Sequence, residues 1–509
     1  MSRRSLSFAA PLALLFASSL ARAQTPPAAA APVAPAGRPI PTTLAPPAAP
    51  AGATGPDAPV SKVTESLEAK LASMQTGNGL TADEAARRAL INNVDVTAKQ
   101  KSIAAADATI DQTTAAFIPK LDLQARYTRL SAITPPAITF PAPTPANPNN
   151  TASFGFPVFL NNYSAQASLN VPISDYVLRL SNAMASAKLN KSAAKSDEQA
   201  TRLAVARDAR VYYYQWIRAQ GANYVAQQAL EAARGHAGDA KNAFDAGLVS
   251  RADVLRTVSQ QKNAELTVAH WANNVAIATE QLRVAMGDGS KVNYEIGENI
   301  LTDLPPLALP ADPDAAYGEA LEHRLEMRQL GDSEASLREQ AKAYRTGNYP
   351  RLDAQANAYY SNPNQRYQPP EDKWHATWDA SIVLSWTPTN IFTASAQAKT
   401  AEAHADEIAA KKGALKNGLR LEVNQAMNAL AEANFGLEAS REGLAAAEEN
   451  YRVRRELYRA GKATIVEVTD AETELTRARL EVVNSHVDVR IARVALTHAL
   501  GRDVTPETH

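Results

Sequence analysis

The chain has 509 residues, enough for two or three ordinary domains or for one long repeat architecture. It is rich in alanine, and its charged residues of both signs are interspersed, a profile typical of long helices packed through small side chains. The net charge of -1 disfavours a nucleic-acid surface, and the absence of cysteine excludes disulfides, thiol metal sites and a lipid-bearing N-terminal cysteine.

Residues 1–23 have the pattern of a secretory signal peptide. Two arginines precede an apolar stretch, Leu6 to Leu20, and Ala21-Arg22-Ala23 forms an A-x-A-like cleavage site. We expect the mature chain to start at Gln24; an N-terminal anchor helix is the alternative, although the apolar stretch is short for one. Later in the chain no apolar run reaches about 18 residues, so a membrane crossing would have to use strands.

Residues 24–79 form a leader that is almost all Ala, Pro, Gly and Thr as far as Pro59. This composition cannot bury a core, so we expect a disordered leader without a site. Order should begin near Leu80, where Thr81 caps a helix with acidic residues in its first turn.

Two patterns in the chain occur twice. Phe117-Ile118-Pro119-Lys120-Leu121-Asp122 returns as Asn348-Tyr349-Pro350-Arg351-Leu352-Asp353. Phe244-Asp245-Ala246-Gly247-Leu248 returns, after a shorter interval, as Tyr458-Arg459-Ala460-Gly461-Lys462. The sequence therefore predicts two repeats, residues 80–300 and 301–503, and a tail, 504–509. The difference between the two intervals assigns a longer Pro- and Asn-rich loop to the first repeat.

Each repeat contains two runs with period-two alternation, typical of strands with one apolar and one polar face. We expect strand hairpins over residues 121–171 and 352–386, with strand lengths suited to a membrane barrel. Aromatic residues lie at the strand ends, as an interfacial girdle requires: Tyr127, Tyr163, Tyr359, Tyr360, Trp374, Trp378 and Trp386. A soluble sheet is the alternative, and because four strands cannot close a membrane barrel, the membrane interpretation requires an oligomer.

Long helical patterns follow each hairpin, from about Tyr176 to Phe244 and from Thr393 to Tyr458, or roughly 100 Å each. Helices about half as long follow each glycine-containing tip and precede each hairpin: Ser250 to Met286, Thr464 to Leu500, Thr81 to Ile118 and Asp312 to Thr346. Two half helices placed end to end match one long helix. The breaks between halves should therefore form a belt midway along the long helices.

The last half helix carries a seven-residue repeat with alternating large and small seam positions. These positions are Val468, Ala471, Leu475, Ala478, Val482, Ser485, Val489, Ala492, Leu496 and Ala499. Small residues let helix backbones approach closely. The pattern predicts a tight antiparallel coiled-coil wall.

Both tips carry capping signals. Gly247 and Gly461 are expected in left-handed C-caps, and two S/T-x-x-D/E patterns follow them, Ser250 with Asp253 and Thr464 with Glu467. Capping alone accounts for both acids. Asp470 lies one turn beyond Glu467 and has no capping role, so it is the better functional candidate.

The duplication, with Tyr458-x-x-Gly461-x-x-Thr464-Ile465-Val466-Glu467-Val468-x-Asp470-Ala471, resembles the TolC-type outer membrane efflux proteins over about Leu80 to Asp503. The resemblance implies a mainly α fold with a β-barrel contribution, in which three chains give four transmembrane strands each and their coiled coils form a periplasmic tunnel. It implies an efflux or secretion channel in the outer membrane, extending into the periplasm, without a cofactor. Its implied partners are two further copies of the chain, a periplasmic adaptor, an inner-membrane pump and outer membrane lipid.

The same resemblance implies roles for the tip residues. Glu467 and Asp470 match acidic rings that narrow the periplasmic entrance and bind or select cations, whereas Asp253 and Tyr458 match residues that tie neighbouring helices shut. The tips that meet the adaptor are Gly247, Leu248, Val249 and Ser250, and Gly461, Lys462, Ala463 and Thr464. The best-known member has an arginine two residues after the glycine, where this chain has Ala463, which implies a weaker or differently wired lock. Only the second tip carries paired acids, so the second repeat is expected to form the gate.

No motif predicts an enzyme. Gly287-Asp288-Gly289-Ser290-Lys291 lacks the spacing of a phosphate loop, and the H-E-x-x-H and G-x-S-x-G motifs are absent. The aromatic cluster around Trp216 lies within a long helix and is expected to pack. The main alternative to a channel is a periplasmic helical adaptor or scaffold of an export complex, which would share the coiled coils but would not need two girdled strand hairpins.

Overall fold

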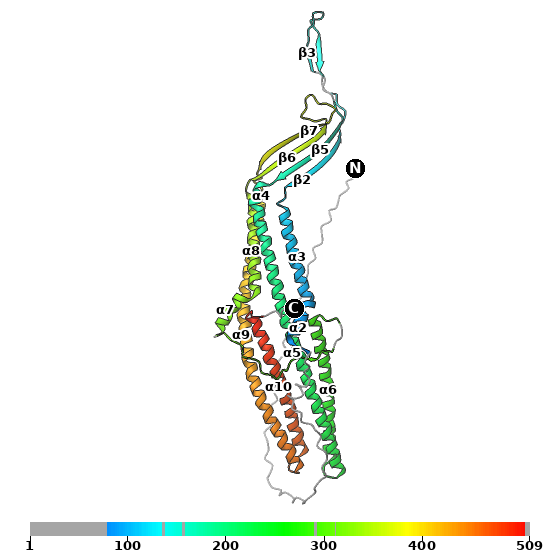
Figure 1. The fold of residues 1–509 in the computed structure, drawn as a ribbon, viewed down its shortest axis with the longest axis vertical. Helices are drawn as coiled ribbons and strands as arrows, with labels where there is room; N and C mark the ends of the chain where they lie inside the picture. The colour runs from blue at the N-terminus through cyan, green and yellow to red at the C-terminus, as the bar shows by residue number, and fades with distance from the viewer. Residues whose placement is uncertain (1–78, 135–137, 155–157, 290–292, 311, 504–509) are drawn as a thin grey trace, which may run out of the picture. The chain divides into compact units, whose positions relative to one another are not determined.

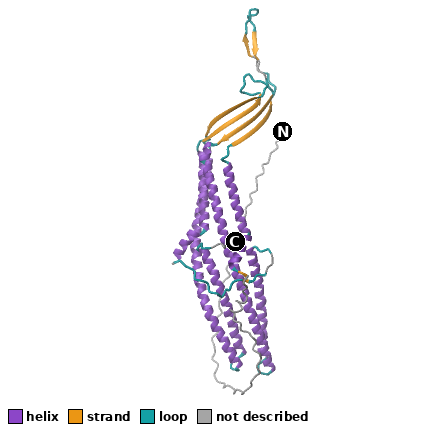
Figure 2. Ribbon diagram, viewed as in Figure 1, coloured by secondary structure: helices purple, strands orange, loops and turns teal. Residues whose placement is uncertain are grey.

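The computed structural model describes residues 79–134, 138–154, 158–289, 293–310 and 312–503. The predicted signal peptide, the predicted leader up to residue 78 and the tail 504–509 lie outside the described residues. Long helices and a four-stranded sheet make up most of the described chain (Figure 2). None of the helices described is both long enough and apolar enough to cross a membrane.

The two repeats share one order of main elements: two helices, two paired or neighbouring long strands, a long helix and a half-length helix (Figure 1). The first contains α2 (Ala82–Asn92), α3 (Val94–Ala115), β2 (Lys120–Arg129), β3 (Ile138–Pro141), β4 (Thr151–Phe154), β5 (Asn161–Val171), α4 (Ile173–Val177), α5 (Arg179–Asp245) and α6 (Arg251–Met286). The second contains α7 (Pro313–His323), α8 (Leu325–Arg345), the short η1 (Thr346–Asn348), β6 (Arg351–Asn362), β7 (His375–Ser385), α9 (Asn390–Arg459) and α10 (Ile465–Ala499). The predicted duplication is confirmed. The first repeat adds the β3–β4 ribbon in its long loop, which the sequence did not predict.

The long and half-length helices have the predicted proportions. Helices α5 and α9 contain 67 and 70 residues and extend about 100 Å at 1.5 Å per residue, whereas α6 and α10 contain 36 and 35 residues. Close to the strands, α5 packs against α3 and α8; towards the tips it packs against α6 and α10 (Figure 1). Helix α5 of the first repeat therefore packs against helices of both repeats along its length.

The helices leading into the strands are each broken in two, and the prediction of one continuous helix in each place is wrong. The breaks lie at Asn93 and Arg324, which are both extended and are separated by the same interval as the two copies of the first repeated pattern. Asn93 caps α3 by accepting hydrogen bonds from the backbone N–H groups of Asp95 and Val96 at 2.7 and 3.4 Å. No glycine or proline marks either break, so the helical periodicity concealed them.

A glycine packs into each break. Gly287 and Gly501 end α6 and α10 with φ of 67° and 69°, a conformation that favours glycine. A Cβ atom at Gly287 would lie 2.6 Å from Asn92 Cβ, and one at Gly501 would lie 2.9 Å from His323 Cβ. In both repeats, therefore, the end of the half helix abuts the break in the leading helix.

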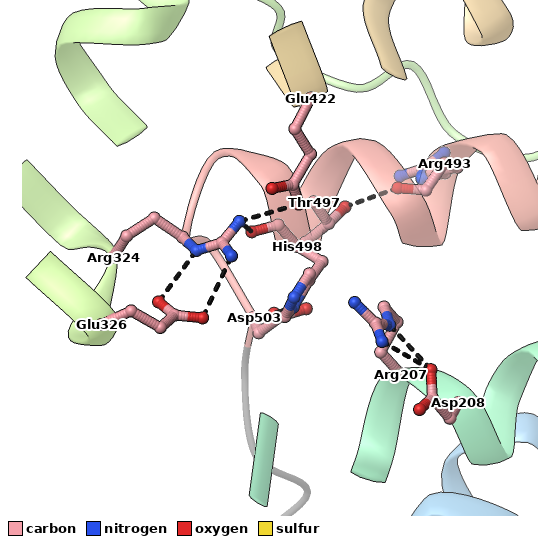
Figure 3. A network of polar contacts seen from close by, with 9 residues as sticks. All are labelled: Arg207, Asp208, Arg324, Glu326, Glu422, Arg493, Thr497, His498 and Asp503. Carbon is pink, nitrogen blue, oxygen red and sulfur yellow. Dashed lines mark hydrogen bonds and ion pairs between the residues drawn. The ribbon is translucent and has the colours of Figure 1, made fainter. Parts of the chain in front are cut away.

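Arg324 holds the second break together (Figure 3). Its Nε and Nη2 atoms donate to the two carboxylate oxygens of Glu326 at 3.0 Å each. Its Nη1 atom donates to Glu422 of α9 at 2.9 Å and to the backbone carbonyl of His498 of α10 at 3.4 Å. This side chain is only 8% exposed and ties three helices at one level.

A connecting segment, residues 293–310, links the breaks of the two repeats. It forms a parallel β-bridge between Ile296 and Leu80, and it accepts hydrogen bonds from Arg490 at the carbonyls of Asn299 and Thr302, at 3.2 and 2.9 Å. Arg502, just after α10, donates to the carbonyl of Ala308 at 2.6 Å. The start of the described chain, its end and the internal connection thus meet, as the predicted belt requires.

The four main strands form one antiparallel sheet with the order β2-β5-β6-β7. The central pair, β5 and β6, joins the two repeats, with Val171 opposite Ala354 and Tyr163 opposite Asn362. Side chains on one face are mostly apolar and exposed; they include Leu121, Leu123, Tyr127, Leu169, Tyr360, Trp378, Ile382 and Leu384. The opposite face carries Asp122, Gln124, Gln166, Ser168, Gln355, Asn357, Asp379 and Ser381. The sheet is therefore two-faced from edge to edge.

Helix α10 is the most enclosed element of the coiled coil. All ten predicted seam positions of α10 are buried, and they pack against α9 and α5. The corresponding helix of the first repeat, α6, keeps large apolar side chains exposed: Leu255, Val258, Leu266, Ile277 and Val284. Helix α10 thus lies inside the helical layer, between α9 and α5, whereas α6 lies at an open edge of the layer.

Candidate gate at the helix tips

The first tip, residues 246–250, reverses the chain between α5 and α6. Gly247 has φ of 75°, and the backbone N–H groups of Gly247 and Leu248 donate to the carbonyls of Phe244 and Ala243 at 2.8 Å each. This pair of bonds is the Schellman C-cap, which satisfies the last free carbonyls of α5. Leu248 is 79% exposed and projects from the tip.

The second tip, residues 460–464, has the same geometry. Gly461 has φ of 70°, its N–H donates to the carbonyl of Tyr458 at 2.9 Å, and that of Lys462 donates to Leu457 at 2.8 Å. The matching geometry follows from the matching sequence, with a glycine at the position that requires positive φ.

Asp253 is engaged in capping α6. Ser250 donates its backbone N–H and its hydroxyl to the Asp253 carboxylate at 3.1 and 2.7 Å, and the N–H of Asp253 donates back to Ser250 Oγ at 3.2 Å. The bonds from Ser250 hold the pKa of Asp253 below its usual value. The capping prediction is confirmed here, and this carboxylate is charged at neutral pH.

Glu467 is held by two partners. One of its carboxylate oxygens accepts from the backbone N–H and hydroxyl of Thr464 at 3.3 and 3.2 Å, closing the second capping box. The other accepts from Arg454 of α9 at 2.5 Å. Arg454 was not predicted from the sequence. The spacing around the tip contains the signal for it, because Arg454 lies seven residues before Gly461 and Glu467 lies six residues after Gly461.

Asp470 stands apart from these contacts. It is exposed on α10, and among the described residues no hydrogen bond or ion pair engages its carboxylate. The structure therefore separates the two acids: Glu467 is fixed within its own hairpin, while Asp470 is available to solvent or to another chain.

Tyr458 of the second tip is influenced by acidic residues of the first repeat. It is half-buried at the end of α9, and burial, with the nearby charges of Asp239 and Asp253, raises its pKa. Tyr458 of the second repeat thus lies close to Asp253 of the first. These two predicted gate residues therefore come from different repeats, whereas Glu467 and Asp470 lie one turn apart on α10.

Polar pairs join α5 and α10 between these tips and the apolar core. Arg479 Nη1 donates to Gln228 Oε1 at 3.3 Å, and nearer the tips His236 Nε2 lies 2.5 Å from Glu472 Oε2. Farther from the tips the same two helices pack through apolar residues, with Gly221 against Val483. The two polar pairs thus lie between the tips and the apolar part of the contact between the repeats. The sequence analysis did not identify His236 or Glu472, because they are far apart in the chain.

Within a single chain, the described residues include no group of three or more His, Cys, Asp or Glu side chains arranged to hold a metal ion. Glu467 and Asp470 are two carboxylates, so any cation ring at the tips would need copies of this chain.

The sequence profile of the outer membrane efflux protein family matches residues 85–288 and 316–502. The two matched segments correspond to the two repeats and cover most of the chain. A comparison with curated proteins finds no match.

Several solved structures share the fold. CusC superposes with a TM-score of 0.68 at 16% identity, over 84% of this chain and 93% of that one. The CmeC outer membrane channel of Campylobacter jejuni gives a TM-score of 0.67 at 14% identity, over 88% and 94%. The MtrE outer membrane channel of Neisseria gonorrhoeae, solved in its open state, gives 0.66 at 16% identity, over 82% and 88%.

Proposed function

Since this chain belongs to the outer membrane efflux protein family, we propose that three copies of it form one continuous export duct from the periplasm across the outer membrane. The observation that carries the proposal is the two-faced sheet. Its apolar face suits outer membrane lipid, and its polar face suits an aqueous lumen. Strands β2 and β7 are its free edges.

Closure of the sheet is the reason for three copies. Four strands leave two edges, whose unpaired backbone groups cannot lie in lipid. Pairing β2 of one copy with β7 of the next removes every edge, and three copies give a twelve-stranded barrel. The exposed apolar residues of α6 would pack against the next copy in the same ring.

The tips are the proposed entrance. Tyr458 lies within the electrostatic reach of Asp253 on the other hairpin of the chain, and Arg454, rather than an arginine at position 463, pairs with Glu467. Asp470, without a partner among the described residues of its own chain, would face its symmetry mates and attract cations. Since MtrE has been solved open, we propose that this entrance opens as well, when a periplasmic adaptor and an inner-membrane pump engage the exposed tip residues.

The family is one of channels rather than enzymes, and we propose no catalytic activity. The alternative of a periplasmic adaptor is not favoured, because the family match includes both repeats and the sheet has a continuous apolar face.

Reconstitution of the purified protein into planar bilayers tests the proposal. We expect cation-selective conductance that divalent cations block, because carboxylate rings concentrate cations at a constriction. Asp470→Asn should weaken the block strongly and Glu467→Gln less, since Arg454 already neutralises Glu467. Glu474→Gln, on an exposed residue of the same helix paired with Arg477, is the control. A protein that fractionates with soluble periplasmic proteins and gives no conductance would refute the channel.

A further inference from the structure

The loop between β6 and β7, residues 363–374, crosses the polar face of the sheet. Asn364 is only 3% exposed, and its side-chain N–H group donates to the carbonyl of His375 at 3.0 Å and to Thr377 Oγ1 at 3.3 Å. His375 and Thr377 belong to the first residues of β7. The loop therefore turns back onto the strand that follows it.

Arg366 extends this contact farther along the strand. Its backbone N–H donates to Asn364 Oδ1 at 3.0 Å, which fixes the turn. Its guanidinium donates to the carbonyl of Trp378 at 2.8 Å and to Asp379 Oδ1 at 3.0 Å, and it lies 5.9 Å from the ring centre of Tyr359. Asp379 and Tyr359 are on the polar face, so the arginine lies over that face.

Aromatic contacts hold the loop on both sides of the sheet. The Tyr367 ring stacks on His375 with centroids 3.9 Å apart, on the polar side. Trp374 stacks on Tyr360 at 4.8 Å and lies 6.0 Å from Tyr163, on the apolar side. The loop thus contacts both faces at the end of the sheet. Its central residues, Arg366 and Tyr367, lie on the polar face.

The loop of the first repeat differs. Its described residues between β2 and β5 include the β3–β4 ribbon, and no hydrogen bond or ring contact connects that ribbon to the polar face. Among the described residues of the two loops, only those of the β6–β7 loop fold onto the polar face.

We propose that the β6–β7 loop is a strap that narrows the outer end of the duct, with Arg366 as its positioning residue. The proposal rests on the proposed function, because the polar face lines a lumen only if the sheet is part of a barrel. Three straps, one from each chain, then lie in the lumen at the end remote from the helical tips. The duct has a second constriction that limits the size of exported molecules, independent of the tip gate.

The absence of cysteine from the chain allows a clean accessibility test. Ser381, two residues beyond Asp379 on the polar face, is exposed and is changed to cysteine. Intact cells are treated from outside with a small membrane-impermeant maleimide and with one carrying a bulky polyethylene glycol chain. The ratio of the two labelling rates measures the width of the outer end.

Arg366→Ala and Asp379→Asn should each raise the rate for the bulky reagent by about tenfold, as expected from the loss of a charge-assisted hydrogen bond, and should leave the small reagent nearly unaffected. The double variant Arg366→Asp, Asp379→Arg keeps the charge pair in reverse. It should restore the slow labelling by the bulky reagent. Lys373→Ala is the matched control, because this exposed loop cation pairs with Glu371, which belongs to the same loop.

Two results would overturn the strap. If the bulky reagent labels at the same rate in the parent and in both variants, each present in the outer membrane at parental levels, the loop does not narrow the duct. If Ser381→Cys reacts only with a membrane-permeant maleimide, the polar face does not line water, and the proposed function fails with the strap. Labelling by the small impermeant reagent separates these cases.

Discussion

His236 and Glu472 form the titratable contact between the hairpins of the two repeats. The side chains are largely buried, and Asp239 of α5 and Arg455 of α9 also act on the imidazole. Burial lowers the pKa of His236, but the carboxylates of Glu472 and Asp239 outweigh burial and raise it above 6.5. The contact therefore contributes its full stability below about pH 6.5, the unfolded value, and loses it as pH rises through the folded value.

Replacement of His236 by Gln should remove this dependence on pH. We expect the variant to be less stable than the parent by roughly 1 kcal/mol at pH 6 and nearly equal at pH 9, because an ion pair contributes on this scale. Thermal unfolding in detergent at a series of pH values measures the difference. His404→Gln, at an exposed histidine paired with Glu407, serves as control. A constant difference across the range would show that His236 acts through packing alone.

Residue-level prediction from the sequence succeeded where the chemistry is local. The capping boxes of Ser250 and Thr464 could be predicted, because both partners lie within four residues of each other. Arg454, His236 and Arg366 were missed, since their partners are brought close only by a hairpin, by the packing of two repeats or by a folded loop.

At the level of elements, the ends of α6 and α10 tolerate little change. Gly287 and Gly501 have positive φ and no room for a Cβ atom. Gly501→Ala places a Cβ against His323 at a positive φ, so we expect a loss of about 2 kcal/mol in the free energy of unfolding. Gly436→Ala, at a helical position of α9 with nothing within 4 Å of the new Cβ, should instead stabilise by about 0.5–1 kcal/mol. Denaturant unfolding compares the two, and equal effects would contradict this account.

Helices and strands could be predicted from the hydrophobic periodicity of the sequence. Features that do not change this periodicity could not be predicted. Helices α5, α6, α9 and α10 and the four main strands were found within a few residues. The breaks at Asn93 and Arg324 were not, because polar side chains cap them without any glycine or proline. The β3–β4 ribbon was missed because its strands are only four residues long.

On the scale of the whole molecule, the open α6 edge predicts how copies associate. Leu266 is 70% exposed on α6, so Leu266→Asp should leave the fold of one chain intact and abolish the proposed trimer, because in that trimer the charge would be buried between copies. Cross-linking and native mass spectrometry measure assembly. Asn149→Asp adds the same charge at the exposed end of the β3–β4 ribbon and should have no effect. Trimers of unchanged yield in Leu266→Asp would place the contact elsewhere.

The pairing of β5 with β6 also constrains the order in which the protein can be built. Val171 lies opposite Ala354, and helices α4 to α8 separate the two residues in the chain, so no short turn connects the two strands. Such non-local pairing has a high contact order and forms slowly, because the intervening chain must first be brought into place. Strands β2 and β5 can pair as soon as the first repeat is made, whereas β6, the other neighbour of β5, belongs to the second repeat. The four-stranded sheet is therefore completed late in folding.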